Sequence, residues 1–104
     1  MTIHIQIRDH WGCIALSGRF DYRTHREFTE AYTRLLDNAT VNKIEIEMSG
    51  VDYIDSSALG MLLLLHYRAL AVNKPVVLLN LSPVASHALE VAHFGSIFNF
   101  KRTA

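Results

Sequence analysis

Hydrophobic and polar residues alternate along the first segment of the chain in the pattern of a β-strand. Ile3, Ile5 and Ile7 are separated by polar residues, so one face of the strand is apolar and the other is polar. A turn at residues 10–12 precedes a second apolar stretch at residues 13–18. The two stretches are predicted to pair as a hairpin.

The spacing changes to that of a helix over residues 22–38. Thr24 is the expected N-cap of this helix and Asn38 its expected end. The apolar residues recur at intervals of three and one and therefore share one face: Phe28, Ala31, Tyr32, Leu35 and Leu36.

The chain then repeats the order of strand and helix. Residues 43–50 alternate again, and a helix is expected from just after Asp55 to about Val72. Pro75 interrupts the pattern, and the continuous apolar run after it is typical of a strand that is buried on both faces.

A third helix is predicted to start at Ser82, an N-cap residue followed by Pro83 at the first helical position. Gly95 is the expected end of this helix, and residues 97–100 the last strand. The residues expected to face inward are Val84, Leu89, Val91 and Ala92.

This order of elements predicts an α/β fold. Helical crossovers between the later strands imply parallel pairing, whereas the first hairpin is antiparallel. We therefore expect one domain, residues 1–104, with a mixed, mostly parallel sheet and helices packed against it.

Composition narrows the classes of partner. Ten basic and ten acidic residues leave no formal net charge, so neither nucleic acid nor a lipid surface is an expected partner. The apolar run Met61–Leu65 is far shorter than the roughly 20 residues that span a bilayer, so membrane insertion is not predicted. A single cysteine, Cys13, and an N-terminus without a signal-peptide core lead us to expect a cytoplasmic protein.

The usual signatures of catalysis are missing. The sequence has no G-x-S-x-G motif and no phosphate-binding glycine loop, and its six histidines do not fall in metal-binding spacings. We therefore predict a protein that is not an enzyme, with no cofactor and no metal site.

The polar triplet Asp55-Ser56-Ser57 directly precedes the most apolar run of the chain. One reading is helix capping, in which a side chain satisfies the first free amides of the helix. One cap is enough for that purpose, so the second reading is that a hydroxyl is presented to a partner or to a kinase at a helix N-terminus.

The helix after the triplet suggests a second surface. Residues Ser57, Met61, Leu64 and Arg68 are predicted to form one outward strip, with Leu59, Leu62, Leu63, His66, Tyr67 and Leu70 packed on the sheet. Met61, Leu64 and Arg68 are then either a partner-binding face or covered by another element.

Two motifs and the element order give the chain a resemblance to a known family. The segments "SGRFD" (residues 17–21) and "DSSALGML" (residues 55–62) resemble those of STAS domains, in particular stand-alone bacterial anti-sigma factor antagonists. The resemblance implies that Ser56 is phosphorylated, that Asp55 and Ser57 flank the acceptor, and that Gly18 and Asp21 belong to the adjoining turn. Ala58 stands where many members have glycine, and alanine favours a helical start.

The same resemblance implies the partners. They are an anti-sigma factor that is a serine kinase of the histidine-kinase-like ATPase fold, and a metal-dependent serine phosphatase. The unphosphorylated protein would sequester the anti-sigma factor, and the phosphorylated protein would release it. The family also contains subunits of membrane lipid-transport complexes and regulators of biofilm formation, and these remain the alternatives.

Overall fold

A five-stranded sheet forms the centre of the computed structural model, which describes residues 1–103. The strands follow one another across the sheet in chain order: β1 (Thr2–Arg8), β2 (Trp11–Phe20), β3 (Lys43–Ile54), β4 (Val76–Leu79) and β5 (Asn99–Lys101). β1 pairs antiparallel with β2, and all later neighbours pair in parallel. The predicted α/β fold with a mixed, mostly parallel sheet is therefore confirmed.

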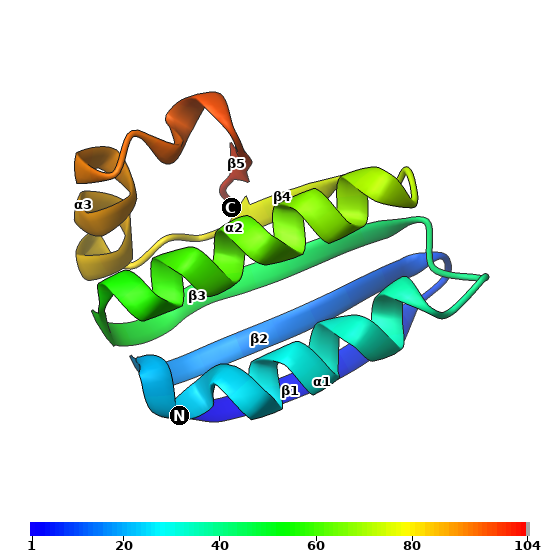
Figure 1. The fold of residues 1–104 in the computed structure, drawn as a ribbon, viewed down its shortest axis with the longest axis horizontal. Coiled ribbons are helices and arrows are strands. Elements are labelled where there is room, and N and C mark those ends of the chain that lie inside the picture. The colour runs from blue at the N-terminus through cyan, green and yellow to red at the C-terminus, as the bar shows by residue number, and fades with distance from the viewer. Residues whose placement is uncertain (104) are drawn as a thin grey trace.

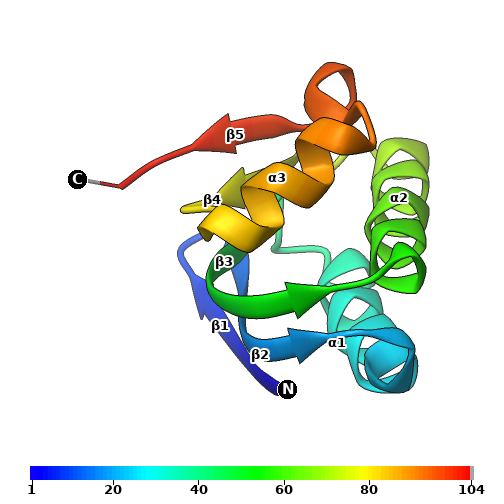
Figure 2. The ribbon, with the colours of Figure 1, turned by 90° about the vertical axis from the view of Figure 1, so that its left-hand side faces the viewer.

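The helical elements are η1 (Tyr22–Thr24), α1 (His25–Leu36), α2 (Ser56–Ala71), α3 (Pro83–Val91) and η2 (Phe94–Ser96). α1 and α2 lie side by side in front of the sheet, and α3 runs across their direction at one end of it (Figure 1). The side view shows α1 and α2 together on one side of the sheet (Figure 2).

The core fills the space between the sheet and this helix pair. Strands contribute alternate residues, helices contribute one stripe each, and the largest fully buried side chains are Phe20, Phe28, Tyr32, Leu35, Ile14, Ile44, Ile46, Met48, Leu62, Leu65, Leu78 and Leu89. Each buried side chain of this size stabilises the fold by about 1.5–3 kcal/mol. All four residues of β4 are buried, which confirms the prediction of a strand buried on both faces.

The helix caps were predicted in part. Ser82 caps α3, since its hydroxyl accepts a hydrogen bond from the Ala85 N–H at 3.1 Å, and Pro83 is the first helical residue. Thr24 immediately precedes α1, but its hydroxyl donates to the Asp21 carbonyl oxygen at 2.7 Å instead of capping the helix. Thr24 is therefore the N-cap residue of α1, as predicted, but its side chain makes no capping hydrogen bond.

The third helix differs most from its prediction. It ends at Val91, well before Gly95, and the chain turns at His93, which has a left-handed φ of 59°. Val84 and Val91 are exposed, whereas Ala85 and Leu89 are buried. Ser86, His87 and Glu90 form the polar side of this short helix. Its apolar side is wider than the face that is buried, so packing against the rest of the fold decides which apolar residues turn inward.

Candidate functional site

The parallel strands β2 and β3 end together, and this brings two distant motifs to one edge of the sheet. Phe20 pairs with Ile54, and the Asp55 N–H donates to the Phe20 carbonyl oxygen at 3.3 Å. The "SGRFD" and "DSSALGML" segments therefore lie side by side. In α/β sheets, binding sites commonly form at the carboxyl ends of parallel strands.

Asp55 connects the two motifs through both of its carboxylate oxygens. Oδ1 accepts a hydrogen bond from the Ala58 N–H at 2.8 Å, which caps α2. Oδ2 accepts one from the Tyr22 N–H at 3.3 Å, which ties the turn after β2 to the start of α2. A cap of this kind contributes about 1 kcal/mol.

The two serines take no part in that cap. Ser56 and Ser57 are the first two residues of α2 and are exposed. Within residues 1–103, neither hydroxyl donates or accepts a hydrogen bond. Because Asp55 alone supplies the cap, both hydroxyls remain available to another molecule at the positive end of a 16-residue helix.

Asp21 is the second carboxylate of the site, and its environment is different. The residue is only 3% exposed, and its Oδ2 lies 2.9 Å from Nη2 of Arg23 and 3.6 Å from Nε of Arg19. The hydrogen bond from the Arg23 side chain is the main reason that the pKa of this carboxyl is lowered. Asp21 is thus held ionised, and it engages the two guanidinium groups of this edge.

Gly18 shapes the end of β2 without contacting the serines directly. Its φ is +98°, which L side chains rarely adopt, and the pairing of β2 with β3 changes register between Gly18 and Arg19. Glycine is therefore required by the backbone at this irregularity. Ala58, the residue after the two serines, is buried in the core.

The predicted partner-binding strip is partly wrong. Met61 is only 4% exposed and belongs to the core, so it cannot lie on an outward face. Leu64 is 40% exposed and Arg68 is exposed, with its guanidinium carbon 5.8 Å from the centre of the Tyr32 ring.

α2 is rotated about its own axis relative to the predicted orientation. The buried residues of α2 are Ala58, Met61, Leu62, Leu65 and Ala69. Tyr67 and Leu70, which were expected to pack on the sheet, are exposed. The outward strip that includes Ser56 runs instead through Gly60, Leu64 and Tyr67.

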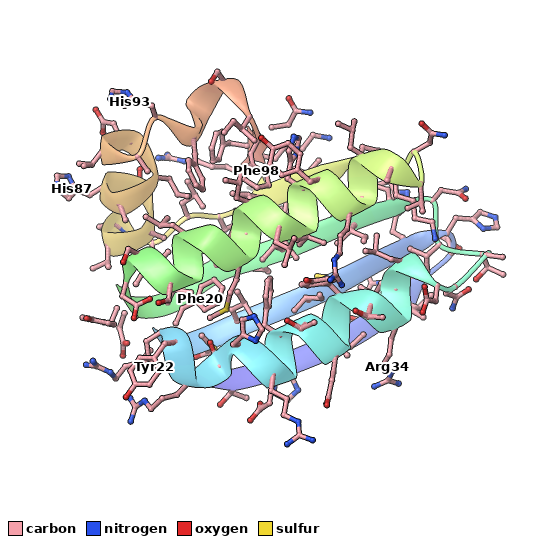
Figure 3. The ribbon with its side chains drawn as sticks, viewed as in Figure 1. Phe20, Tyr22, Arg34, His87, His93 and Phe98 are labelled. Atoms are coloured by element: carbon pink, nitrogen blue, oxygen red, sulfur yellow. The ribbon has the colours of Figure 1, made fainter. Side chains whose placement is uncertain are left out.

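Sequence reasoning missed the aromatic residues of this edge. Tyr22 is 67% exposed and lies at the end of the molecule where α1 begins, close to the buried Phe20 (Figure 3). Tyr53 is also exposed, and the Arg19 guanidinium carbon lies 3.9 Å from the centre of its ring. The available signal was a tyrosine next to each motif, Tyr22 directly after "SGRFD" and Tyr53 two residues before Asp55, since Tyr and Arg are enriched at protein interfaces.

The side chains that could bind a metal or act as nucleophiles do not gather at this edge. His87 and His93 project from the region of α3, apart from each other (Figure 3). Among residues 1–103, no group of three or more His, Cys, Asp or Glu side chains is arranged to hold a metal ion. Cys13 is half-buried, and burial raises the pKa of its thiol, so it is a weak nucleophile.

A groove of about 710 Å³ lies between α3 and the last strand, away from the serines. It is lined by Leu81, Pro83, Ser86, Leu89, Glu90, Gly95, Phe100, Lys101 and Arg102. None of the predicted site residues contributes to this groove. Tyr22, Tyr53, Ser56 and Ser57 are all exposed at the carboxyl ends of β2 and β3, and we call this surface the serine edge. An exposed surface suits a protein partner better than an enclosed small molecule.

The comparison with known families agrees with the two motifs. A family model described as "Mlab, STAS domain" matches residues 3–98. The chain belongs to the STAS domain family. A STAS-domain containing protein of Pseudomonas aeruginosa (strain UCBPP-PA14) is 38% identical to this STAS protein over 85 residues, or 82% of each chain.

Solved structures share the STAS fold of this chain. An anti-sigma factor antagonist from Mycobacterium paratuberculosis has a TM-score of 0.82 at 17% identity, covering 98% of this chain and 86% of that one. SpoIIAA in its unphosphorylated form has a TM-score of 0.76 at 21% identity, covering 99% of this chain and 89% of that one. Bacillus SpoIIAA in its phosphorylated form has a TM-score of 0.78 at 18% identity, covering 99% of this chain and 92% of that one.

Across residues 1–103, no helix of the STAS protein combines the length and apolar character needed to cross a membrane.

Proposed function

We propose that this STAS protein is a phosphorylation-controlled regulatory binding protein of the anti-sigma factor antagonist type. Unphosphorylated, it sequesters an anti-sigma factor that is also a serine kinase; phosphorylated at Ser56, it releases that partner. The observation that carries the proposal is an exposed Ser56 hydroxyl at a helix N-terminus whose cap is supplied entirely by Asp55. The chain itself catalyses no reaction in this scheme, which operates in the cytoplasm.

The modification is a phosphoryl transfer from ATP. A bond forms between Ser56 Oγ and the γ-phosphorus as the bond from that phosphorus to the oxygen of ADP breaks. The serine proton passes to a base of the kinase, and ADP leaves. A metal-dependent serine phosphatase restores the hydroxyl by hydrolysis and releases inorganic phosphate.

Release follows from the position of the new charge. A phosphoserine carries about −1.5 to −2 charges at neutral pH. The helix dipole of α2 stabilises such an anion by about 0.3–1 kcal/mol in the free protein. At an interface, a buried unpaired charge costs about 2–5 kcal/mol, which is roughly 30-fold to several thousand-fold in affinity. The interface penalty is larger, so the partner dissociates.

The local charges of the site do not cancel this penalty. Arg19 and Arg23, the cations of the adjoining turn, already engage the buried Asp21. A phosphate on Ser56 would have to compete with that carboxylate for them. The likeness of the chain to both forms of SpoIIAA also supports a switch that leaves the fold intact.

The first test identifies the acceptor. The protein is incubated with ATP and the serine kinase encoded beside its gene, followed by intact-mass measurement and phosphopeptide mapping. We expect one phosphate, on Ser56. Modification of Ser57 alone contradicts the assignment. Stable binding to a transport ATPase without any modification would replace the proposal with the alternative of a transport-complex subunit.

The second test measures the switch. We expect Ser56→Asp to bind the kinase at least tenfold more weakly than Ser56→Ala in titration calorimetry, because only the aspartate carries a charge into the interface. Ser57→Asp is the matched control, since it adds the same charge one residue away. Equal affinities of the Ser56→Asp and Ser56→Ala forms would refute the electrostatic mechanism.

A further inference from the structure

Gly60 lies in the interior of α2, where its missing side chain serves no purpose within the protein. The residue is exposed, and a Cβ built on it would meet no atom within 4 Å. Glycine destabilises a helix interior relative to alanine because it loses more backbone entropy on folding. The fold therefore offers no reason for glycine at this position.

Three other glycines do have a reason within the fold. A Cβ on Gly12 would come within 2.8 Å of Leu35 Cδ2, and one on Gly50 within 2.8 Å of Ser17 Oγ. Gly18 has a positive φ of 98°. Gly95 resembles Gly60 in having open space around it, but it lies in the short η2 turn instead of a helix interior.

Helix geometry places Gly60 on the same face of α2 as Ser56. Ser56, Gly60 and Leu64 are spaced four residues apart, so they follow one another along the outward face of α2. Each step is about 6 Å along the axis, at 1.5 Å per residue. The Ser56 hydroxyl is therefore followed by bare backbone for one turn and then by the half-exposed Leu64.

A kinase that modifies Ser56 must cover this turn. Its reacting groups have to come within about 3–3.5 Å of the hydroxyl. A specific protein interface also buries roughly 800 Å² on each partner, which extends well beyond a single residue. The outward face of the first two turns of α2 thus falls inside the contact area, and it is uncovered in front of the sheet (Figure 1).

We propose that Gly60 is a specificity-determining contact at which the serine kinase packs directly on the bare backbone of α2. The proposal rests on the phosphorylation of Ser56 suggested above. It adds that the missing side chain is required by the kinase and not by the fold. A methyl group at this position would hold the kinase surface away from the helix and misplace the hydroxyl.

The test separates folding from recognition with three variants. We expect Gly60→Ala to raise the melting temperature by about 4 °C, yet to lower kcat/KM for phosphorylation by the kinase about tenfold. Gly60→Gln, which is larger but also favours helix, should lower it further. Gly95→Ala is the matched control, since it adds a methyl group in equally open space, and its phosphorylation should equal that of the wild type.

The outcomes distinguish this inference from the proposed function. A wild-type chain that the kinase does not phosphorylate overturns both. Wild-type rates for Gly60→Ala and Gly60→Gln overturn only the role of Gly60. A lower melting temperature together with slower phosphorylation of Gly60→Ala also overturns it, because the glycine would then be required by the fold.

Discussion

At the scale of single residues, the two carboxylates of the serine edge have separate roles. Asp55 caps α2 and holds the Tyr22 N–H, so that the serines are left free. Asp21 is buried against Arg23 and fixes the turn after β2. The Ser56 hydroxyl thus lies beside two carboxylates that make no hydrogen bond to it within the described residues.

Asp21 makes stability depend on pH in a defined direction. Because the hydrogen bond from Arg23 lowers its pKa, the folded state favours the ionised carboxyl. This stabilisation is complete above the unfolded pKa of about 3.9, and it is lost as pH falls through the lower folded pKa. Asp21→Asn should therefore lower the free energy of unfolding at pH 7, with a deficit that shrinks below about pH 4.

Urea denaturation at pH 7, 5 and 3.5 measures this effect. Asp52→Asn is the control. Asp52 lies near the carboxyl end of β3, is exposed, and makes no side-chain hydrogen bond within the described residues. A deficit for Asp21→Asn that stays constant from pH 7 to 3.5 would contradict the assignment.

At the scale of elements, α2 has one face in the core and one face exposed. Apolar residues surround most of its length, but only five residues of α2 are buried: Ala58, Met61, Leu62, Leu65 and Ala69. Tertiary packing therefore decides which of its large side chains become surface. Leu64 faces outward, and Met61 does not.

A pair of substitutions tests that orientation. Met61→Ser should lower the free energy of unfolding by about 2–5 kcal/mol, since it removes a buried side chain from the core. Leu64→Ser should change it by about 1 kcal/mol or less, because the side chain is half-exposed. Urea denaturation of both variants decides the matter, and equal losses would show that Leu64 is also part of the core.

At the scale of the whole molecule, the two serines and the core lie in different places. The carboxyl ends of β2 and β3 carry the serine edge, while the packed interior lies between the sheet and the α1–α2 pair (Figure 1). A charge on Ser56 is added outside the interior, where water and the helix dipole can stabilise it.

The expected consequence is a local response to phosphorylation. Amide NMR spectra of Ser56→Asp should differ from those of the wild type mainly at residues 19–24 and 53–60, with a melting temperature within a few degrees. Ser56→Ala provides the uncharged control. Shifts distributed over β1 and β4 would argue instead for a rearrangement of the sheet.

The parts of the candidate site that depend on short sequence motifs could be predicted from the sequence. Asp55, Ser56 and Ser57 were recognised because capping residues before an apolar run predict a helix start. Gly18 and Asp21 came from the family motif. Gly18 lies where the pairing of β2 with β3 changes register, and Asp21 lies in the turn after β2, paired with Arg23. The Tyr22 contact to Asp55 joins residues 33 positions apart, and no local pattern indicates it.

The sequence by itself determined the type and order of the elements. Period-two alternation, helical spacing and capping residues are local properties, and they predict the mixed, mostly parallel sheet with its crossover helices. Only the tertiary structure decided which face of α2 and α3 turns inward, so that Met61 is buried and Val84 is exposed. The physical reason is that the apolar residues of α2 lie nearly all round that helix, and those of α3 spread over more of its surface than is buried, so neither helix has a single inward face specified by its own sequence. The rotation of each helix is set by how its side chains pack against the sheet and the neighbouring helix.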